Sequence, residues 1–178
     1  VRDVTPVADV TPSSGGVLLD DIRALIDTYV DLPDEHCSVV MALWVVHTYL
    51  LGHLDHTPRL AFMSPEPGSG KSRALEVLEL LCHRSHMSMS ISSAALCRMV
   101  SNEQTRPTVL IDEIDAVFSP KSAGNNEDLR AVLNAGYRAG QKVTRVADPA
   151  ANTLNTFDTF AAVALAGLNT LPDTVATR

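Results

Sequence analysis

The sequence predicts a three-layer α/β protein with a mainly parallel sheet of about five strands and a helical extension at its N-terminus. The prediction rests on apolar runs that are separated by helical patterns. The first run, residues 58–64, passes through a glycine-rich turn into residues with helical spacing. The second, Thr108–Ile111, ends at two acidic residues, and the third, Phe160–Ala166, is apolar throughout. Uninterrupted apolar runs of this length are typical of parallel strands that are buried on both faces.

The glycine-rich turn, Ser64–Ser72, has the sequence SPEPGSGKS. It resembles a Walker A phosphate-binding loop, G-x-x-x-x-G-K-[ST], except that Pro65 stands at the first glycine. Glycines let successive backbone N–H groups point at one anion, and the following helix adds the positive end of its dipole. An ordinary turn before Lys-Ser is the alternative, and the flanking strand and helix count against it. The residues expected to bind the nucleotide are Pro67, Gly68, Ser69, Gly70, Lys71, Ser72 and Arg73.

Individual side chains at the two motifs have specific expected roles. Lys71 would reach the β- and γ-phosphates, and the Ser72 hydroxyl would ligate Mg²⁺. Asp112 ends the second apolar run as in a Walker B element, and it would hold Mg²⁺ through its waters on a strand beside the phosphate strand. Glu113 would polarise the attacking water as a general base. The alternative for Asp112 and Glu113 is that they form an acidic strand end exposed to solvent. Asp115 is expected to face solvent or to cap a helix.

The net charge of −7 is unevenly distributed. Residues 1–57 hold nine acidic and two basic residues, and residues 58–178 hold twelve of each. The C-terminal part is therefore not a generally basic surface for coating DNA. The three cysteines have no regular spacing, which favours a reducing compartment, and we expect a cytoplasmic protein. No signal-peptide pattern opens the chain, and the apolar run 39–51 is too short to span a bilayer.

The N-terminal third divides into two parts. Residues 1–16 are rich in Thr, Pro, Ser, Gly and Asp and are expected to be a flexible lead-in. Residues 17–57 are expected to form a helical extension. Its first helix is amphipathic and ends at Leu32–Pro33, and its second runs from about Asp34 to Leu51 and is apolar nearly all round, hence buried. These helices are expected either to form a lid over the nucleotide base or to cover one face of the sheet.

Residues 58–178 are expected to form the nucleotide-binding core, and their remaining elements follow from alternating and helical patterns. These elements are a strand at His86–Ser92, a helix capped by Ser92 or Ser93, a functional loop at Phe118–Asn126, a helix capped by Asn125 or Asn126 and ending at Gly140, and a hairpin of Lys142–Ala147 with Thr153–Phe157.

Taken together, the motifs resemble those of an AAA+ type P-loop ATPase, of the branch with an extra strand between the two Walker strands. From Arg59 to Arg178 the chain also resembles an uncharacterised ATPase family of phages, prophages and actinobacterial plasmids, which is associated with primase- and helicase-like proteins. The shared blocks are SPEPGSGKS, LEVLELL, LIDE and AGLNTLPDTVATR. The resemblance implies ATP and Mg²⁺ as ligands and a homo-oligomeric ring such as a hexamer. It also implies one more core strand and a helical lid after Arg178.

Further residue roles are implied by the resemblance alone. Asn169 falls where such ATPases keep sensor 1, a polar group that helps to position the attacking water, and a turn asparagine is the alternative. Arg178 sits like an arginine finger, which stabilises transition-state charge on a neighbouring subunit's nucleotide, and a surface arginine is the alternative. Lys142 and Arg145 lie on the expected hairpin, at the place of a hairpin that some helicases use to grip DNA. The alternative is that Lys142 and Arg145 only lie on a solvent-exposed edge of the hairpin.

The expected function is Mg²⁺-dependent ATP hydrolysis that drives a motor or remodelling step on DNA, within phage or mobile-element replication. A nucleotide-gated loader or scaffold that hydrolyses ATP slowly is one alternative. A small-molecule kinase is another, although no acceptor pocket or kinase lid is recognisable. The sequence lacks the guanine-reading motif N-K-x-D, so ATP is the expected nucleotide. No membrane partner is expected.

Overall fold

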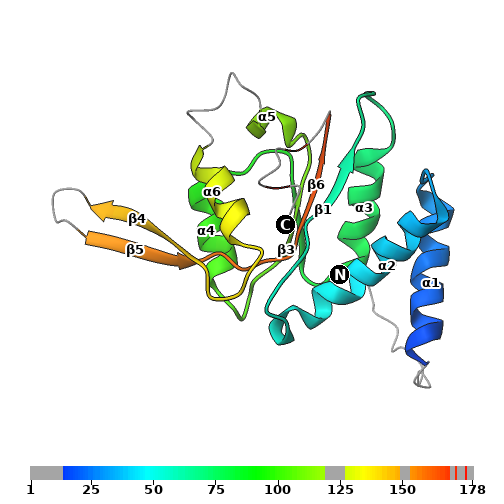
Figure 1. Cartoon of the computed structure of the whole chain (residues 1–178), viewed down its shortest axis with the longest axis horizontal. Helices are drawn as coiled ribbons and strands as arrows, with labels where there is room; N and C mark the ends of the chain where they lie inside the picture. The colour runs from blue at the N-terminus through cyan, green and yellow to red at the C-terminus, as the bar shows by residue number, and fades with distance from the viewer. Residues whose placement is uncertain (1–13, 119–126, 149–152, 169–170, 172–174, 176–178) are drawn as a thin grey trace, which may run out of the picture.

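The structure is a computed structural model that describes residues 14–118, 127–148 and 153–168, together with Leu171 and Val175. Four parallel strands form one sheet in the order β1-β6-β3-β2 (Figure 1). Their bounds are β1 (Leu60–Met63), β2 (Ser85–Ser88), β3 (Thr108–Ile111) and β6 (Val163–Gly167). The α/β class and the parallel sheet are confirmed.

The expectation of about five strands is wrong for the described chain, whose parallel sheet has four. The other two strands, β4 (Lys142–Asp148) and β5 (Thr153–Asp158), pair only with each other in an antiparallel ladder. This confirms the predicted hairpin, which projects from the body of the molecule at the left of Figure 1.

The strand that carries Asp112 does not lie beside the phosphate strand. β6 separates them, because it pairs with β1 on one side, from Leu60↔Ala164 to Met63↔Gly167, and with β3 on the other. All five residues of β6 are buried, whereas β1 is partly exposed at the edge of the described sheet. A continuous apolar run is stable at the centre of a sheet, where both faces are covered. The expectation that β1 is a buried strand is therefore also wrong.

Helices cover both faces of the sheet, which confirms three layers. Alternate residues of β6 belong to different hydrophobic clusters, as the two-residue period of a strand requires. Ala164 and Ala166 pack with α3 (Lys71–Leu81), whereas Val163 and Leu165 pack with α4 (Ser93–Ser101) and α6 (Glu127–Ala135). The Ser92 hydroxyl accepts a hydrogen bond from the Ala95 amide at 3.2 Å, which confirms Ser92 as the N-cap of α4.

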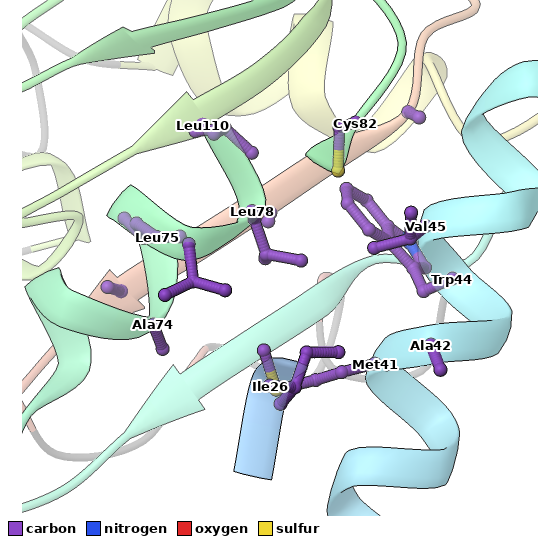
Figure 2. Close-up of a cluster of buried hydrophobic side chains, with 14 of the residues drawn as sticks. Ile26, Met41, Ala42, Trp44, Val45, Ala74, Leu75, Leu78, Cys82 and Leu110 are labelled. Atoms are coloured by element: carbon purple, nitrogen blue, oxygen red, sulfur yellow. The ribbon is translucent and has the colours of Figure 1, made fainter. Parts of the chain in front are cut away.

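The N-terminal extension is a helical pair, α1 (Gly15–Tyr29) and α2 (Glu35–Leu50), followed by a short 3₁₀ turn, Leu51–His53. The Asp34 side chain caps α2 by accepting from the His36 amide at 2.7 Å. Figure 2 shows side chains of this pair facing those of α3. The pair therefore covers one face of the sheet, which is one of its two expected roles, whereas contact with a nucleotide base stays a prediction.

The expectation that α2 is buried all round is wrong. Met41, Trp44 and Val45 are buried against the core, but Val40 and Leu43 are 53% and 52% exposed. Only one side of α2 has a packing partner in the described chain, and apolar composition alone does not say which side that is. The exposed apolar residues of α2 are Val39, Val40, Leu43, Tyr49 and Leu50.

The helix that was expected to end at Gly140 ends earlier, at Ala135. The Gly136 carbonyl oxygen accepts from the Ala161 amide at 3.2 Å, and a Cβ atom at Gly136 would lie 2.3 Å from the Thr159 carbonyl oxygen, so only glycine fits there. The chain turns there and reaches β4 through Gly140, whose φ of 79° is left-handed. The expected lead-in, the loop before α6 and its Asn125 or Asn126 cap lie wholly or mostly outside the described residues. Among the described helices, none combines the length and apolarity that crossing a membrane would need.

Candidate functional site

The glycine-rich turn connects β1 directly to α3, as the sequence predicts. Gly68 and Gly70 have φ values of 73° and 84°, a conformation that side chains other than glycine disfavour. A Cβ atom added at either glycine would meet nothing within 4 Å. The glycines are therefore required by the backbone conformation and not by crowding, and the space above the turn is open.

The first turn of α3 leaves its amide groups available. Gly70 occupies the N-cap position, and no side chain caps the helix there. Uncapped N–H groups and the positive end of the helix dipole together favour an anion at this place. The Lys71 ammonium lies over the same turn, where it donates to the Glu66 carbonyl oxygen and to the Ser69 hydroxyl, both at 2.9 Å. The turn therefore presents backbone amides and one cationic side chain together.

The acidic pair forms a second turn at the end of β3. All four residues of β3 are buried, and Asp112, which follows it, is 8% exposed. Its carboxylate accepts a hydrogen bond from the Glu113 amide at 2.9 Å. Glu113 is exposed and has a φ of 55°, one of two positive φ values among the described residues that are not glycine. Such a conformation costs about 1–2 kcal/mol and marks candidate functional positions.

Both turns meet the C-terminal end of β6. The Ser64 amide, at the start of the glycine-rich turn, donates to the Gly167 carbonyl oxygen at 3.4 Å. The Ile114 amide, just after the acidic pair, donates to the Ala166 carbonyl oxygen at 2.9 Å. Since β6 lies between β1 and β3, the ends of these two strands are two strand spacings apart, about 10 Å. The sequence-predicted phosphate and metal residues thus share the carboxyl edge of one parallel sheet.

The oxygen donors at this edge suit Mg²⁺ better than a transition metal. No group of three His, Cys, Asp or Glu side chains arranged to hold a metal occurs in the described residues. Mg²⁺ does not need such a group, since it is usually bound by one or two protein oxygens together with substrate phosphates and water. The Ser72 hydroxyl and the Asp112 carboxylate are hard oxygen donors of this kind.

The other predicted site residues fall into two groups. Asn169 and Arg178 lie outside the described residues. Lys142 begins β4, and Arg145 follows on the same strand, but the Arg145 guanidinium pairs with the Asp128 carboxylate of α6 at 3.1 Å. Arg145 is thus already engaged within the chain.

Sequence reasoning missed the role of Asp115, which was expected to be a solvent or capping residue. Its carboxylate accepts a hydrogen bond from the Leu168 amide at 2.9 Å, so it joins α5 (Asp115–Phe118) to the residue after β6. The two residues are 53 positions apart, and no sequence pattern signals the pair. Only the order of the strands brings them together.

Arg59 is a second residue that the sequence does not single out. Its guanidinium donates to the Ala161 and Leu133 carbonyl oxygens at 2.6 and 2.8 Å. Burial lowers the pKa of Arg59 to about 10, and the side chain remains protonated at neutral pH. Arg59 therefore fastens the start of β1 to β6 and α6, at the opposite edge of the sheet from the two turns.

Comparison with known proteins does not assign this chain to a family. No family model matches the chain, and no curated protein matches it significantly.

Proposed function

We propose that this chain binds a nucleoside triphosphate with Mg²⁺ and hydrolyses it, and that its core is of the P-loop type. The observation that carries the proposal is the meeting of two turns at the end of β6. One turn has left-handed glycines, a lysine and an uncapped helix, and the other has a buried and an exposed carboxylate. Phosphate binding at a helix N-terminus and a carboxylate at the same edge of the sheet are the two parts that nucleotide hydrolysis needs.

The phosphate chain would lie over the glycine-rich turn. Backbone amides of Gly68–Gly70 and the first turn of α3 would donate to its oxygens, and Lys71 would neutralise the β- and γ-phosphates. To do so, the Lys71 ammonium would exchange its present bonds to Glu66 and Ser69 for phosphate oxygens. This exchange replaces neutral acceptors by charged ones, which make stronger hydrogen bonds.

Ser72 and Asp112 would hold the metal ion. A Mg²⁺ ion bound there would neutralise charge that develops on the phosphates during transfer. Burial of Asp112 behind β3, with its carboxylate fixed by the Glu113 amide, keeps this donor in one orientation. A preorganised acceptor costs little to order when the ligand binds.

Glu113 would accept the proton of the attacking water. Its side chain is exposed, unlike that of Asp112, so it is accessible to solvent at the same edge of the sheet. The two adjacent carboxylates thus have different environments, one suited to the metal and one to the water. ATP is the proposed nucleotide, with AAA+ like assembly into a homo-oligomeric ring.

The use of this hydrolysis on DNA, as a motor or remodelling step in phage or mobile-element replication, is supported by the resemblance of the motif blocks. The hairpin β4–β5 is the proposed contact, with Lys142 as its available cation, because Arg145 pairs with Asp128. A nucleotide-gated loader or scaffold is the competing proposal. It predicts tight ATP binding with turnover that DNA does not increase.

Steady-state phosphate release, measured with and without single-stranded and duplex DNA, separates these proposals. We expect Mg²⁺-dependent release without any added phosphate acceptor, which is not the behaviour of a small-molecule kinase. Glu113→Gln should reduce release by about 100-fold or more. Glu103→Gln, in the turn before β3 and at the amino end of that strand, is the matched control. Release that DNA leaves unchanged, together with tight ATP binding, would favour the loader.

A further inference from the structure

We propose that Asp115 is a positioning residue that fastens the acidic turn to the C-terminal end of β6 and thereby holds Glu113 in its left-handed conformation. The inference rests on the proposed function, because it concerns how that site keeps its shape. It adds a residue that neither the motif pattern nor the resemblance assigns. Asp115 does not itself touch the nucleotide or the metal in this proposal.

The contact is specific on both sides. The Asp115 carboxylate oxygen Oδ1 accepts from the Leu168 amide at 2.9 Å. The neighbouring Gly167 leaves room for it, since a Cβ atom there would lie 2.9 Å from the same Oδ1 and 2.9 Å from Ile114 Cγ2. Any larger residue at Gly167 would push this carboxylate or the backbone aside. Gly167 is therefore explained by the close approach of Ile114 and Asp115 together.

A second bond links the acidic turn to β6 in the described part of the chain, from the Ile114 amide to the Ala166 carbonyl oxygen at 2.9 Å. The other end of α5 is held separately, because the Arg130 guanidinium donates to the Val117 carbonyl oxygen at 3.2 Å. Asp115 thus secures the end of α5 that adjoins Glu113. A residue at a positive φ persists only where its surroundings hold it, and Asp115 supplies part of that restraint.

The conformation matters for the chemistry because Glu113 must stay within hydrogen-bond reach of the attacking water. A small displacement of a catalytic group costs about 100-fold in rate. Phosphate binding depends on the glycine-rich turn and on Lys71. Asp112 is held separately from Asp115, by burial and by the hydrogen bond that its amide donates to the Ser88 carbonyl oxygen at 3.0 Å. Loss of Asp115 should therefore reduce turnover and leave affinity intact.

The experiment compares Asp115→Ala with Asp115→Asn. The asparagine retains an oxygen acceptor at the same position, whereas alanine removes it. We expect Asp115→Ala to lower the rate of phosphate release by about 10- to 100-fold while the Kd for ATP with Mg²⁺ changes by less than about two-fold. Asp115→Asn should restore release to within a few-fold of wild type. Equal loss in both variants, or a parallel loss of ATP affinity, would overturn the inference.

Amide hydrogen exchange provides a readout that does not depend on activity. Exchange of the Leu168 amide should accelerate by about ten-fold or more in Asp115→Ala and stay near the wild-type rate in Asp115→Asn. Unchanged exchange in the alanine variant would overturn the proposed link. A wild-type protein that neither binds nor hydrolyses ATP would instead overturn the proposed function and the catalytic part of this inference, while the exchange rates still report on the link.

Discussion

Three of the five described residues with a positive φ lie in the candidate site. Gly68, Gly70 and Glu113 all have φ values between 55° and 84°, and they lie in the two turns that meet at the end of β6. The glycines adopt this conformation without steric cost, whereas Glu113 does not. At Glu113 the chain retains a carboxylate where glycine would be less strained, which is expected if the carboxylate is needed for the reaction.

Gly70→Ala tests the conformational requirement of the glycine-rich turn. Because φ is 84° there, we expect the free energy of unfolding to fall by about 1–2 kcal/mol, and ATP affinity to fall as well. Gly52→Ala is the matched control, since a Cβ atom at Gly52 also meets nothing within 4 Å and its φ is not left-handed. Chemical denaturation and equilibrium binding measure both effects. Equal stability of the two variants would contradict a strained turn.

His47 makes stability depend on pH. Its Nε2 atom lies 2.9 Å from the Thr57 hydroxyl, and burial lowers its pKa from 6.5. The unfolded chain then binds more protons than the folded chain at mildly acidic pH. The contribution of neutral His47 to the free energy of unfolding should therefore be fully present above the pKa of this residue in the unfolded chain. It should decrease as the pH falls below about 6.5.

His47→Gln should flatten this part of the stability curve when unfolding by denaturant is measured from pH 7.5 to pH 5. His36→Gln is the control, because the His36 side chain is 81% exposed. An unchanged slope in His47→Gln would show that other groups produce the acid sensitivity.

At the scale of elements, the sequence predicted most of the fold correctly where local chemistry decides it. Thr108–Ile111 has the predicted bounds, Ser92 caps α4, and the β4–β5 hairpin pairs as expected. Predictions failed where tertiary contacts decide. α6 ends at Ala135, beside the contact of Gly136 with Thr159 and Ala161, and the packing of α2 leaves one apolar side exposed.

The one-sided burial of α2 is tested by two substitutions on the same helix. Met41 is 1% exposed, so Met41→Ala should lower the free energy of unfolding by about 2–5 kcal/mol. Leu43 is 52% exposed, and Leu43→Ala should change it by less than about 0.5 kcal/mol. Both values come from denaturant titration of the purified variants. A comparable loss at Leu43 would mean that this side of α2 is covered in solution.

At the scale of the whole molecule, the candidate site is a product of strand order. The sequence identified both turns and their residue types, because glycine, lysine and carboxylate patterns are local. The local patterns put the strand before Asp112 beside the phosphate strand, and only the resemblance implied a strand between the two. Neither indicated that Asp115 contacts Leu168, because this contact joins distant segments. The position of β6 inside the sheet agrees with its sequence, since all five of its residues are apolar or glycine and buried.

Calorimetric titration with ATP and Mg²⁺ tests whether the glycine-rich turn binds a nucleoside triphosphate through Lys71. We expect the wild-type protein to bind ATP and Lys71→Ala to bind it at least about 10-fold more weakly, since a charge-assisted contact is lost. Lys142→Ala, on the hairpin away from this turn, should bind like wild type. Equal affinity in wild type and Lys71→Ala, or no binding by wild type, would show that the glycine-rich turn is not a nucleotide site.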